Sequence, residues 1–324
     1  MREKKSRMVK IVVPDDFPQA ITGTEAHEKL KRYGELRIYN TKAESQKEFI
    51  ERIKEANIVL NIRAYSKFTD EVLRSSTELK MISIWGAGTD HVDLRTARKL
   101  GIVISNTHGS STISIAEHTI ALIFAVSRNI PEIHQAVKRG QWPRGYVVEL
   151  YGKTLGIVGT GSIGQRVCEL GKSIGMKVIS WTYHPSKEGA KRLGIEFVSL
   201  KELLKRADVI SVHLRLSPET EGLIGEKEFD LMKPTAIIIN TARGAIIDHQ
   251  ALVEALREKK IAGAGIDVYP VEPISADDPL LKLDNVVLTP HSAGMTREAM
   301  DAGLNMAVDN IIQFTQGKPV RIVS

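Results

Sequence analysis

The chain has 324 residues, enough for two domains of ordinary size, and its 42% hydrophobic and 26% charged residues are typical of soluble globular proteins. The net charge of +6 falls to +2 once the basic start (residues 1–10) is set aside. No aromatic-interleaved basic patch or membrane-length apolar run follows, so we expect neither a nucleic-acid partner nor a membrane span. The single cysteine, Cys168, excludes an intrachain disulfide and, with no secretory pattern at the start, leads us to expect a cytoplasmic protein.

Short runs rich in β-branched residues alternate with helical patterns over the first third of the chain. This alternation predicts the buried strands of a parallel sheet with helices on both of its faces. One predicted helix ends at Gly101, a residue typical of a helix terminus, and a longer apolar helix is predicted near 112–130. The predicted strands lie at 10–14, 36–40, 57–62, 79–85 and 102–106.

A second series of strands begins after a loop rich in Gly, Pro and Trp at 139–146. Two of its helices carry N-terminal capping signals, Ser199 with Glu202 and Asp248. The final helical segment, 296–317, has no further strand after it, so we expect it to pack against the first domain and make that domain discontinuous. The sequence therefore predicts an α/β protein with two doubly wound parallel-sheet domains. The strands of the second domain are predicted at 154–159, 176–182, 208–214, 236–242, 263–269 and 285–290.

The sequence GIVGTGSIGQ (156–165) places three glycines between a predicted strand and a predicted helix. In this setting Gly159 permits a tight turn, Gly161 lets the backbone approach a pyrophosphate, and Gly164 lets helix and strand pack closely. The amides at the N-terminus of the helix then favour an anionic ligand. We therefore predict a dinucleotide-binding loop, formed by Gly159, Thr160, Gly161, Ser162, Ile163 and Gly164.

The acidic residue that usually binds the adenosine ribose of NAD, about 20 residues further on, is absent. The second strand of this series ends at Thr182, and the sequence YHP follows. Without a carboxylate here a 2′-phosphate would meet no repulsion, and Thr182, Ser186 and Lys187 could solvate it. The pattern favours NADP over NAD, and NAD stays open because another polar group can bind its ribose.

Three further strand ends of the second series carry reactive side chains, in NTARG (240–244), GIDVYPVEP (265–273) and TPHSAG (289–294). Ligands gather at the carboxyl ends of parallel strands, so these groups should converge near the cofactor loop. Hydride transfer to a 2-oxo acid needs a cation for the carboxylate and a proton donor for the new hydroxyl. Arg243 offers bidentate carboxylate binding, His291 an acid or base that works near neutral pH, and Glu272 a partner that favours the imidazolium. Each also has an ordinary alternative, as a surface charge or a hydrogen-bonding residue.

In order and spacing, GIVGTGSIGQ, NTARG, DVYPVEP and TPHSAG resemble the motifs of the D-isomer-specific 2-hydroxyacid dehydrogenase family, over about residues 11–319. The resemblance implies that Arg243 binds the substrate carboxylate, that His291 is the general acid/base and that Glu272 is its partner. It also implies a flavodoxin-like substrate domain (1–105 plus 292–324) around a Rossmann cofactor domain (106–291), with the active site in the cleft.

The resemblance extends to contacts with the cofactor. It implies that Asp267 and the backbone of Thr241 and Ala242 hold the nicotinamide carboxamide, and that His213 and Arg215 line the adenosine pocket. Arg215 stands where the family usually has a proline. An arginine there could stack on adenine or meet a 2′-phosphate, which again favours NADP.

In the first domain, the sequence WGAGTDHVD (85–93) matches the family's substrate loop. The resemblance implies that the amides of Ala87 and Gly88 bind the substrate carboxylate. Arg63 matches a position where phosphoglycerate dehydrogenases place an arginine facing the substrate. The ordinary alternatives are a simple glycine turn after a strand and a surface arginine.

The leading interpretation is an NAD(P)-dependent oxidoreductase acting on a small D-2-hydroxy or 2-oxo acid, with glyoxylate and hydroxypyruvate as candidates and a phosphoglycerate dehydrogenase as the specific alternative. The alternative from a different functional class is a non-catalytic, NAD(H)-sensing corepressor that resembles the same family. The absence of long disordered extensions argues against it. Since family members are commonly dimers through the cofactor domain, we expect a homodimer. The nine histidines and one cysteine show no metal-binding spacing, so no metal is expected.

Overall fold

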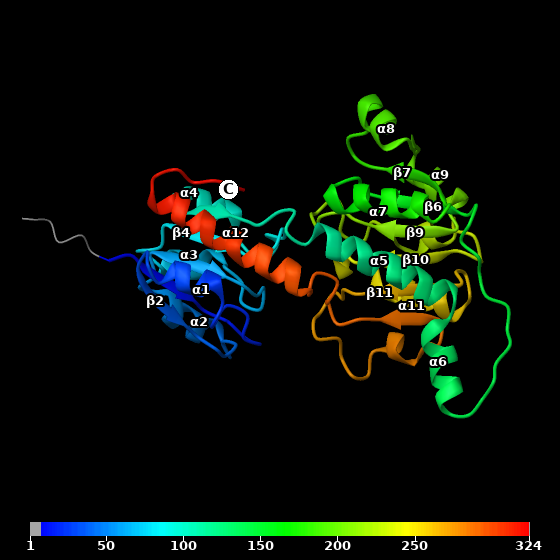
Figure 1. Cartoon of the computed structure of the whole chain (residues 1–324), viewed down its shortest axis with the longest axis horizontal. Helices are drawn as coiled ribbons and strands as arrows, with labels where there is room; N and C mark the ends of the chain where they lie inside the picture. Colours follow the sequence, from blue (N-terminus) through cyan, green and yellow to red (C-terminus); the bar gives the residue numbers. More distant parts are fainter. Residues whose placement is uncertain (1–7, 324) are drawn as a thin grey trace, which may run out of the picture. The chain divides into compact units, whose positions relative to one another are not determined.

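The computed structural model describes residues 8–323, so most of the basic start of the chain lies outside the described residues. The described chain forms two compact units, shown in Figure 1. Unit 1 comprises residues 8–111 and 296–323, and unit 2 comprises Thr112–Met295. The boundaries expected from the sequence, 105/106 and 291/292, lie a few residues before these divisions.

Unit 1 is built on a five-stranded sheet in the order β2-β1-β3-β4-β5, in which every neighbouring pair is parallel. This is the flavodoxin-like order of a doubly wound sheet, as predicted. The two central strands, β3 and β4, are buried along their whole length because helices cover both faces. The strands are β1 (Lys10–Val13), β2 (Glu35–Ile38), β3 (Ile58–Asn61), β4 (Met81–Ile84) and β5 (Val103–Ser105).

Two apolar clusters form the core of unit 1. One contains residues of α2, α3 and α4, such as Phe49 and Val72, and the other contains residues of α1 and α12. The final helix, α12, contributes the buried side chains Leu304, Val308 and Ile311 and lies beside α1 in Figure 1. The last part of the sequence therefore completes the core of unit 1. The helices are α1 (Glu25–Leu30), α2 (Gln46–Ile53), α3 (Asp70–Ser75), α4 (Leu94–Lys99) and α12 (Arg297–Thr315).

Unit 2 is built on a seven-stranded parallel sheet in the order β12-β11-β10-β9-β6-β7-β8. The chain enters at β6 and winds outward in both directions, which is the Rossmann order. The short edge strand β8 was not among the predicted strands, because two residues are too few to show a pattern. The strands are β6 (Thr154–Val158), β7 (Lys177–Trp181), β8 (Glu196–Phe197), β9 (Val209–Val212), β10 (Ile237–Asn240), β11 (Gly263–Ile266) and β12 (Val286–Leu288).

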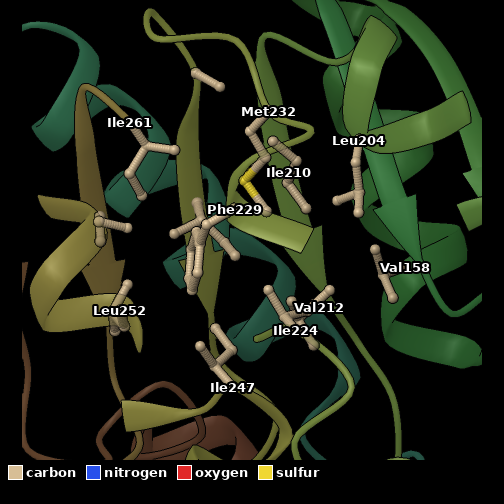
Figure 2. Packing of buried hydrophobic residues seen from close by; sticks show 14 of the residues in the cluster. Val158, Leu204, Ile210, Val212, Ile224, Phe229, Met232, Ile247, Leu252 and Ile261 are labelled. Atoms are coloured by element: carbon tan, nitrogen blue, oxygen red, sulfur yellow. The ribbon is translucent and has the colours of Figure 1, made fainter. Parts of the chain in front are cut away.

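Two apolar clusters also form the core of unit 2. Residues of α5 and α7 belong to one, which includes the buried Cys168, and residues of α9, α10 and α11 belong to the other. Figure 2 shows side chains of the second cluster, among them Phe229, Met232 and Ile210, packed together. The helices of unit 2 are α5 (Thr112–Ser127), α6 (Ile130–Lys138), α7 (Ser162–Ser173), α8 (Lys187–Leu193), α9 (Leu200–Arg206), α10 (Glu226–Phe229) and α11 (His249–Arg257), with 3₁₀ turns at Gly244–Ile246 and Pro279–Lys282.

The single long helix predicted near 112–130 is in fact two helices, α5 and α6. Asn129 adopts a left-handed φ of 48°, and Pro131 lies in the first turn of α6, where its missing amide is tolerated. The two helices are bent by 61° relative to each other. Within residues 8–323 no single helix is long and apolar enough to cross a bilayer, and only this bent pair passes that test together.

Candidate active site

A histidine–carboxylate pair lies on two strand-end loops of unit 2. His291, which follows β12, places its Nδ1 at 2.7 Å from Glu272 Oε2, and Glu272 Oε1 accepts a hydrogen bond of 3.0 Å from the amide of Tyr269. An ionised carboxylate only accepts hydrogen bonds, so Nδ1 carries the proton of this bond. Nε2 is then the ring atom at which a proton can be exchanged with a substrate.

The environment of Glu272 favours its ionised form. Partial burial opposes ionisation, but the hydrogen bonds from His291 and from the amide of Tyr269, with the positive charges of His291 and Arg243, hold the pKa of Glu272 below its ordinary value. Its side chain is 36% exposed and that of His291 is 47% exposed. Glu272 is therefore ionised, and the hydrogen-bonded pair is still accessible from outside the protein.

Arg243 lies close to this pair, on the loop after β10. Its charge is one of those that lower the pKa of Glu272, and its Nη1 donates to the carbonyl of Ala242 at 2.9 Å. The next residue, Gly244, brings the two loops into backbone contact: a Cβ there would lie 2.1 Å from the carbonyl carbon of Tyr269. The structure thus brings together the guanidinium, imidazole and carboxyl groups selected from the sequence.

Asp267, at the end of β11, is fully buried. Its Oδ1 accepts hydrogen bonds from Thr289 Oγ1 (2.6 Å) and the amide of Ser292 (2.8 Å), and its Oδ2 from the amide of Ala293 (3.0 Å). Its carbonyl accepts a bond of 2.7 Å from the amide of His291. The side chain of Asp267 thus braces the loop that carries His291, a role that the sequence reasoning missed, and its contact with a carboxamide stays a prediction.

The glycine loop has the form that a dinucleotide needs. Gly159 has a φ of +101°, and a Cβ there would collide with the carbonyl of His213 at 2.7 Å. At Gly164 a Cβ would lie 2.0 Å from the carbonyl oxygen of Gly159, so only glycine lets helix and strand approach. At Gly161 a Cβ would meet nothing within 4 Å, and no side chain caps the N-terminus of α7 there. An open, uncapped helix N-terminus of this kind fits a pyrophosphate.

The other predicted residues of the glycine loop lie at the N-terminus of α7 or directly before it. Thr160 accepts a hydrogen bond at its carbonyl from Gln165, and Ser162 and Ile163 are the first residues of α7, where the amides have no partner within the helix. Ser162 Oγ lies 3.3 Å from Thr112 Oγ1 of α5. The predicted pyrophosphate contacts themselves stay a prediction.

The residues predicted to surround the adenosine lie on two neighbouring loops. Tyr183, next to the half-buried Thr182, donates from its hydroxyl to the carbonyl of Glu219 at 2.9 Å, which joins the loop after β7 to the loop that begins at His213. Arg215 on the second loop is exposed. Burial lowers the pKa of His213 to about 3, and its Nε2 lies 2.8 Å from Ser211 Oγ, so this histidine is neutral at physiological pH.

The substrate residues predicted in the first domain lie in unit 1. The guanidinium of Arg63 donates to the carbonyl of Pro18 at 3.0 Å and lies 5.9 Å from the ring of Trp85. The loop with Ala87 and Gly88 is held by bonds from Asn106 to the carbonyl of Ala87 (2.9 Å) and from the amide of Gly86 to a threonine hydroxyl (2.7 Å). The substrate contacts of these three residues stay a prediction.

Two other kinds of chemistry find no support among the described residues. Burial raises the pKa of Cys168 to about 12, so this thiol is not a nucleophile at neutral pH. Between residues 8 and 323, no three His, Cys, Asp or Glu side chains are grouped as a metal site requires.

Comparison with known proteins adds independent observations. Residues 120–293 match the family model described as "D-isomer specific 2-hydroxyacid dehydrogenase, NAD binding domain". The chain is 41% identical to a glyoxylate reductase of Aeropyrum pernix, over 95% of this chain and 92% of that protein. It is 40% identical to a D-3-phosphoglycerate dehydrogenase of Methanocaldococcus jannaschii, over 96% of this chain but only 58% of that protein's length.

A solved structure is also similar over nearly the whole chain. It is an acyclic imino acid reductase in complex with NADPH and D-Arg, 31% identical, with a TM-score of 0.89. The alignment covers 98% of this chain and 100% of that one.

Proposed function

Since the chain belongs to the D-isomer-specific 2-hydroxyacid dehydrogenase family, we propose that it transfers a hydride between nicotinamide and a small D-2-hydroxy acid or 2-oxo acid in the cytoplasm. The observation that carries this proposal is the His291–Glu272 pair at 2.7 Å, with Arg243 close enough to lower the pKa of Glu272. The similarity to a glyoxylate reductase, an enzyme named for a 2-oxo acid, supports the proposal.

The chemistry divides among these three side chains. A bound nicotinamide dinucleotide would supply or accept the hydride. Arg243 would bind the carboxylate of the acid through its planar guanidinium. In the direction of reduction, His291 would donate a proton from Nε2 to the carbonyl oxygen, while Glu272 holds Nδ1 and stabilises the positive charge of the ring.

The direct test is oxidation of NADH and of NADPH by the purified protein with glyoxylate, hydroxypyruvate and 3-phosphohydroxypyruvate. We expect turnover of at least one acid, with Arg243→Ala raising KM for that acid and lowering kcat. If the phosphorylated acid is the substrate, Arg63→Ala should raise its KM without changing KM for glyoxylate. Tight cofactor binding with no turnover of any acid would instead favour an NAD(H)-sensing binding protein.

For the cofactor, we propose a preference for NADP over NAD. No carboxylate follows β7, where Thr182 stands, and the Tyr183–Glu219 bond brings this strand end beside the loop of the exposed Arg215. A 2′-phosphate at the end of β7 would therefore meet no carboxylate at position 182, and Arg215 offers a cation on the neighbouring loop.

Thr182→Asp tests this preference because a carboxylate would repel a 2′-phosphate. We expect KM for NADPH to rise about 10-fold or more, while KM for NADH stays equal or falls. The neutral variant Thr182→Asn has nearly the same shape and controls for steric effects. Equal effects of both substitutions on both cofactors would count against the proposal.

We also propose that the protein is a homodimer through unit 2. The segment from α6 to β6 exposes many large apolar side chains, and residues 141–150 have no helix or strand of their own. Such a surface is unusual for a monomer. Sedimentation should give a dimer for the wild type and a monomer for the double variant Trp142→Asp/Tyr146→Asp. The exposed apolar residues are Ile130, Val137, Trp142, Tyr146, Val147, Val148 and Tyr151.

A further inference from the structure

Two consecutive residues of α5 are hydrogen-bonded to two different loops of the candidate active site. His118 Nε2 lies 3.0 Å from Thr289 Oγ1, at the start of the loop that carries His291. Thr119 Oγ1 lies 3.0 Å from Thr241 Oγ1, at the start of the loop that carries Arg243. One helix therefore contacts both loops through neighbouring side chains.

The direction of the first bond follows from its neighbours. Asp267 Oδ1 lies 2.6 Å from Thr289 Oγ1, and the two oxygens of Asp267 also accept the amides of Ser292 and Ala293. A carboxylate with these donors is an acceptor, so the hydroxyl proton of Thr289 points to Asp267. Thr289 can then only accept from His118, whose Nε2 must carry a proton.

This chain of hydrogen bonds ends at the backbone of the candidate acid/base. His291 has a φ of +51°, a left-handed conformation that residues with a side chain rarely adopt, so surrounding contacts must maintain it. The amide of His291 donates to the carbonyl of Asp267, and the next two amides donate to its carboxylate, so these bonds supply such contacts. His118 adds a donor behind them, and its Nε2 lies 3.6 Å from Asp267 Oδ1.

The second bond is equally well defined. Thr119 is fully buried, and its hydroxyl donates to the carbonyl of Ile115 at 2.8 Å, so the hydroxyl of Thr241 donates to Thr119. Thr241 itself is 7% exposed. Its side chain is thus anchored to α5, and this fixes where the loop toward Arg243 begins.

We propose that His118 and Thr119 are positioning residues, through which α5 sets the placement of the His291 loop and the Arg243 loop separately. The inference rests on the proposed function, because it assigns these two loops to proton transfer and to carboxylate binding. Small displacements of groups at a reaction centre change rates strongly, so both bonds should be visible in kinetics.

Substitutions of His118 and of Thr119 should have different kinetic effects. His118→Leu should lower kcat about 10-fold and change KM for the acid less than about 2-fold, and His118→Gln, which keeps an N–H donor, should recover most of kcat. Thr119→Val should raise KM for the acid about 5-fold with a smaller change in kcat, and Thr119→Ser should restore it. Equal changes in both parameters for both residues, or no recovery with Gln and Ser, would overturn the proposal.

A double-mutant cycle tests the connection through Thr289. If His118 acts through this hydroxyl, His118→Leu/Thr289→Val should lower kcat no more than the stronger single variant. If the effects of the two single substitutions on kcat instead multiply in the double variant, His118 acts by another route and the proposal is wrong.

Amide hydrogen exchange gives a readout that does not need activity. Exchange in the peptide around 288–295 should accelerate in His118→Leu but not in Thr119→Val, and the reverse should hold for the peptide around 238–245. If the wild type reduces no 2-oxo acid, the proposed function fails while exchange still decides the positioning role. If exchange in both peptides is unchanged in an active protein, the positioning role fails alone.

Discussion

Two hydrogen-bonded pairs with a carboxylate, one at a strand end in each unit, differ sharply in their surroundings. In unit 1, the guanidinium of Arg52 contacts Asp15 at 3.2 Å, and the two side chains are only 5% and 1% exposed. In unit 2, His291 and Glu272 are 2.7 Å apart, and their side chains are 47% and 36% exposed. Both pairs follow or face the carboxyl end of a parallel strand, where a ligand would be expected.

The hydrogen bonds explain the difference. Arg52 also donates to the carbonyls of Pro14 and Thr41 at 2.6 Å, and Asp15 accepts from the amide of Ala43 and the hydroxyl of Ser66. This pair is saturated from within unit 1 and serves as a brace. The His291–Glu272 pair keeps an exposed ring with one nitrogen available for proton exchange. A charged side chain at a strand end is thus a candidate for catalysis when some of its hydrogen-bonding atoms are still unused. The type of residue alone does not decide this.

The largest expected effect is on the exposed pair. His291→Ala should lower kcat about 10²–10⁴-fold, which is the usual contribution of a positioned proton donor, and should lower the free energy of unfolding by no more than about 1 kcal/mol. Steady-state kinetics and urea unfolding measure the two quantities. Lys47→Ala, at an exposed position on α2 of unit 1, is the control and should leave both unchanged. Near wild-type kinetics in His291→Ala would remove this residue from the mechanism.

The buried pair should behave in the opposite way. Arg52→Met leaves the carboxylate of Asp15 buried without its partner, so the free energy of unfolding should fall by about 3–5 kcal/mol. Values of kcat for the folded fraction should stay within about 2-fold of the wild type. Arg74→Met, at the exposed pair with Asp70, should leave the urea midpoint unchanged. A catalytic loss in Arg52→Met at full stability would contradict the distinction between the two pairs.

A smaller effect is expected for the carboxylate of the exposed pair. The pKa of Glu272 is lowered in the folded protein, so the pair persists at neutral pH and is lost as the pH falls through this lowered value. Glu272→Gln should lower kcat about 10²-fold at neutral pH and remove the acid-side decline of kcat that depends on this group. A pH profile of kcat with an unchanged acid limb would show that another group causes that decline.

The smallest effect concerns His213, a half-buried residue that follows β9. Its pKa is about 3 in the folded protein against 6.5 ordinarily, so the unfolded chain binds more protons between these values. The stability that its neutral form allows is complete above about pH 6.5 and is lost progressively toward pH 3. Between pH 7 and pH 5 the thermal midpoint of His213→Gln should fall about 2–4 °C less than that of the wild type. Parallel midpoint curves would contradict this assignment.

Much of the fold could be predicted from the sequence. The buried strands of both sheets are runs of Val, Ile and Leu, and Ser199 and Asp248 cap their helices as the capping signals indicated. The break between α5 and α6 was missed because the apolar pattern continues to residue 130, although Pro131 was a visible signal. The two-residue strand β8 depends on its neighbour in the sheet and leaves no pattern of its own.

For the candidate site, the reactive residues could be predicted from the sequence, but the residues that hold them in place could not. Arg243, Glu272 and His291 could be selected because each reactive residue follows a strand of the second series. The bracing roles of Asp267, Thr289 and Thr119 could not, since hydrogen bonds between distant segments follow only from the packing of α5 on the sheet. His118 and Thr119 interrupt an apolar helix, and that interruption was the one available signal.

The return of α12 to unit 1 has a consequence for protein synthesis. Unit 2 is one continuous stretch, whereas unit 1 takes the core residues Leu304, Val308 and Ile311 from the last 30 or so positions. During translation the ribosome therefore releases everything needed for the second sheet while the first still lacks one covering helix. The half of the protein that is made first should be the half that finishes folding last.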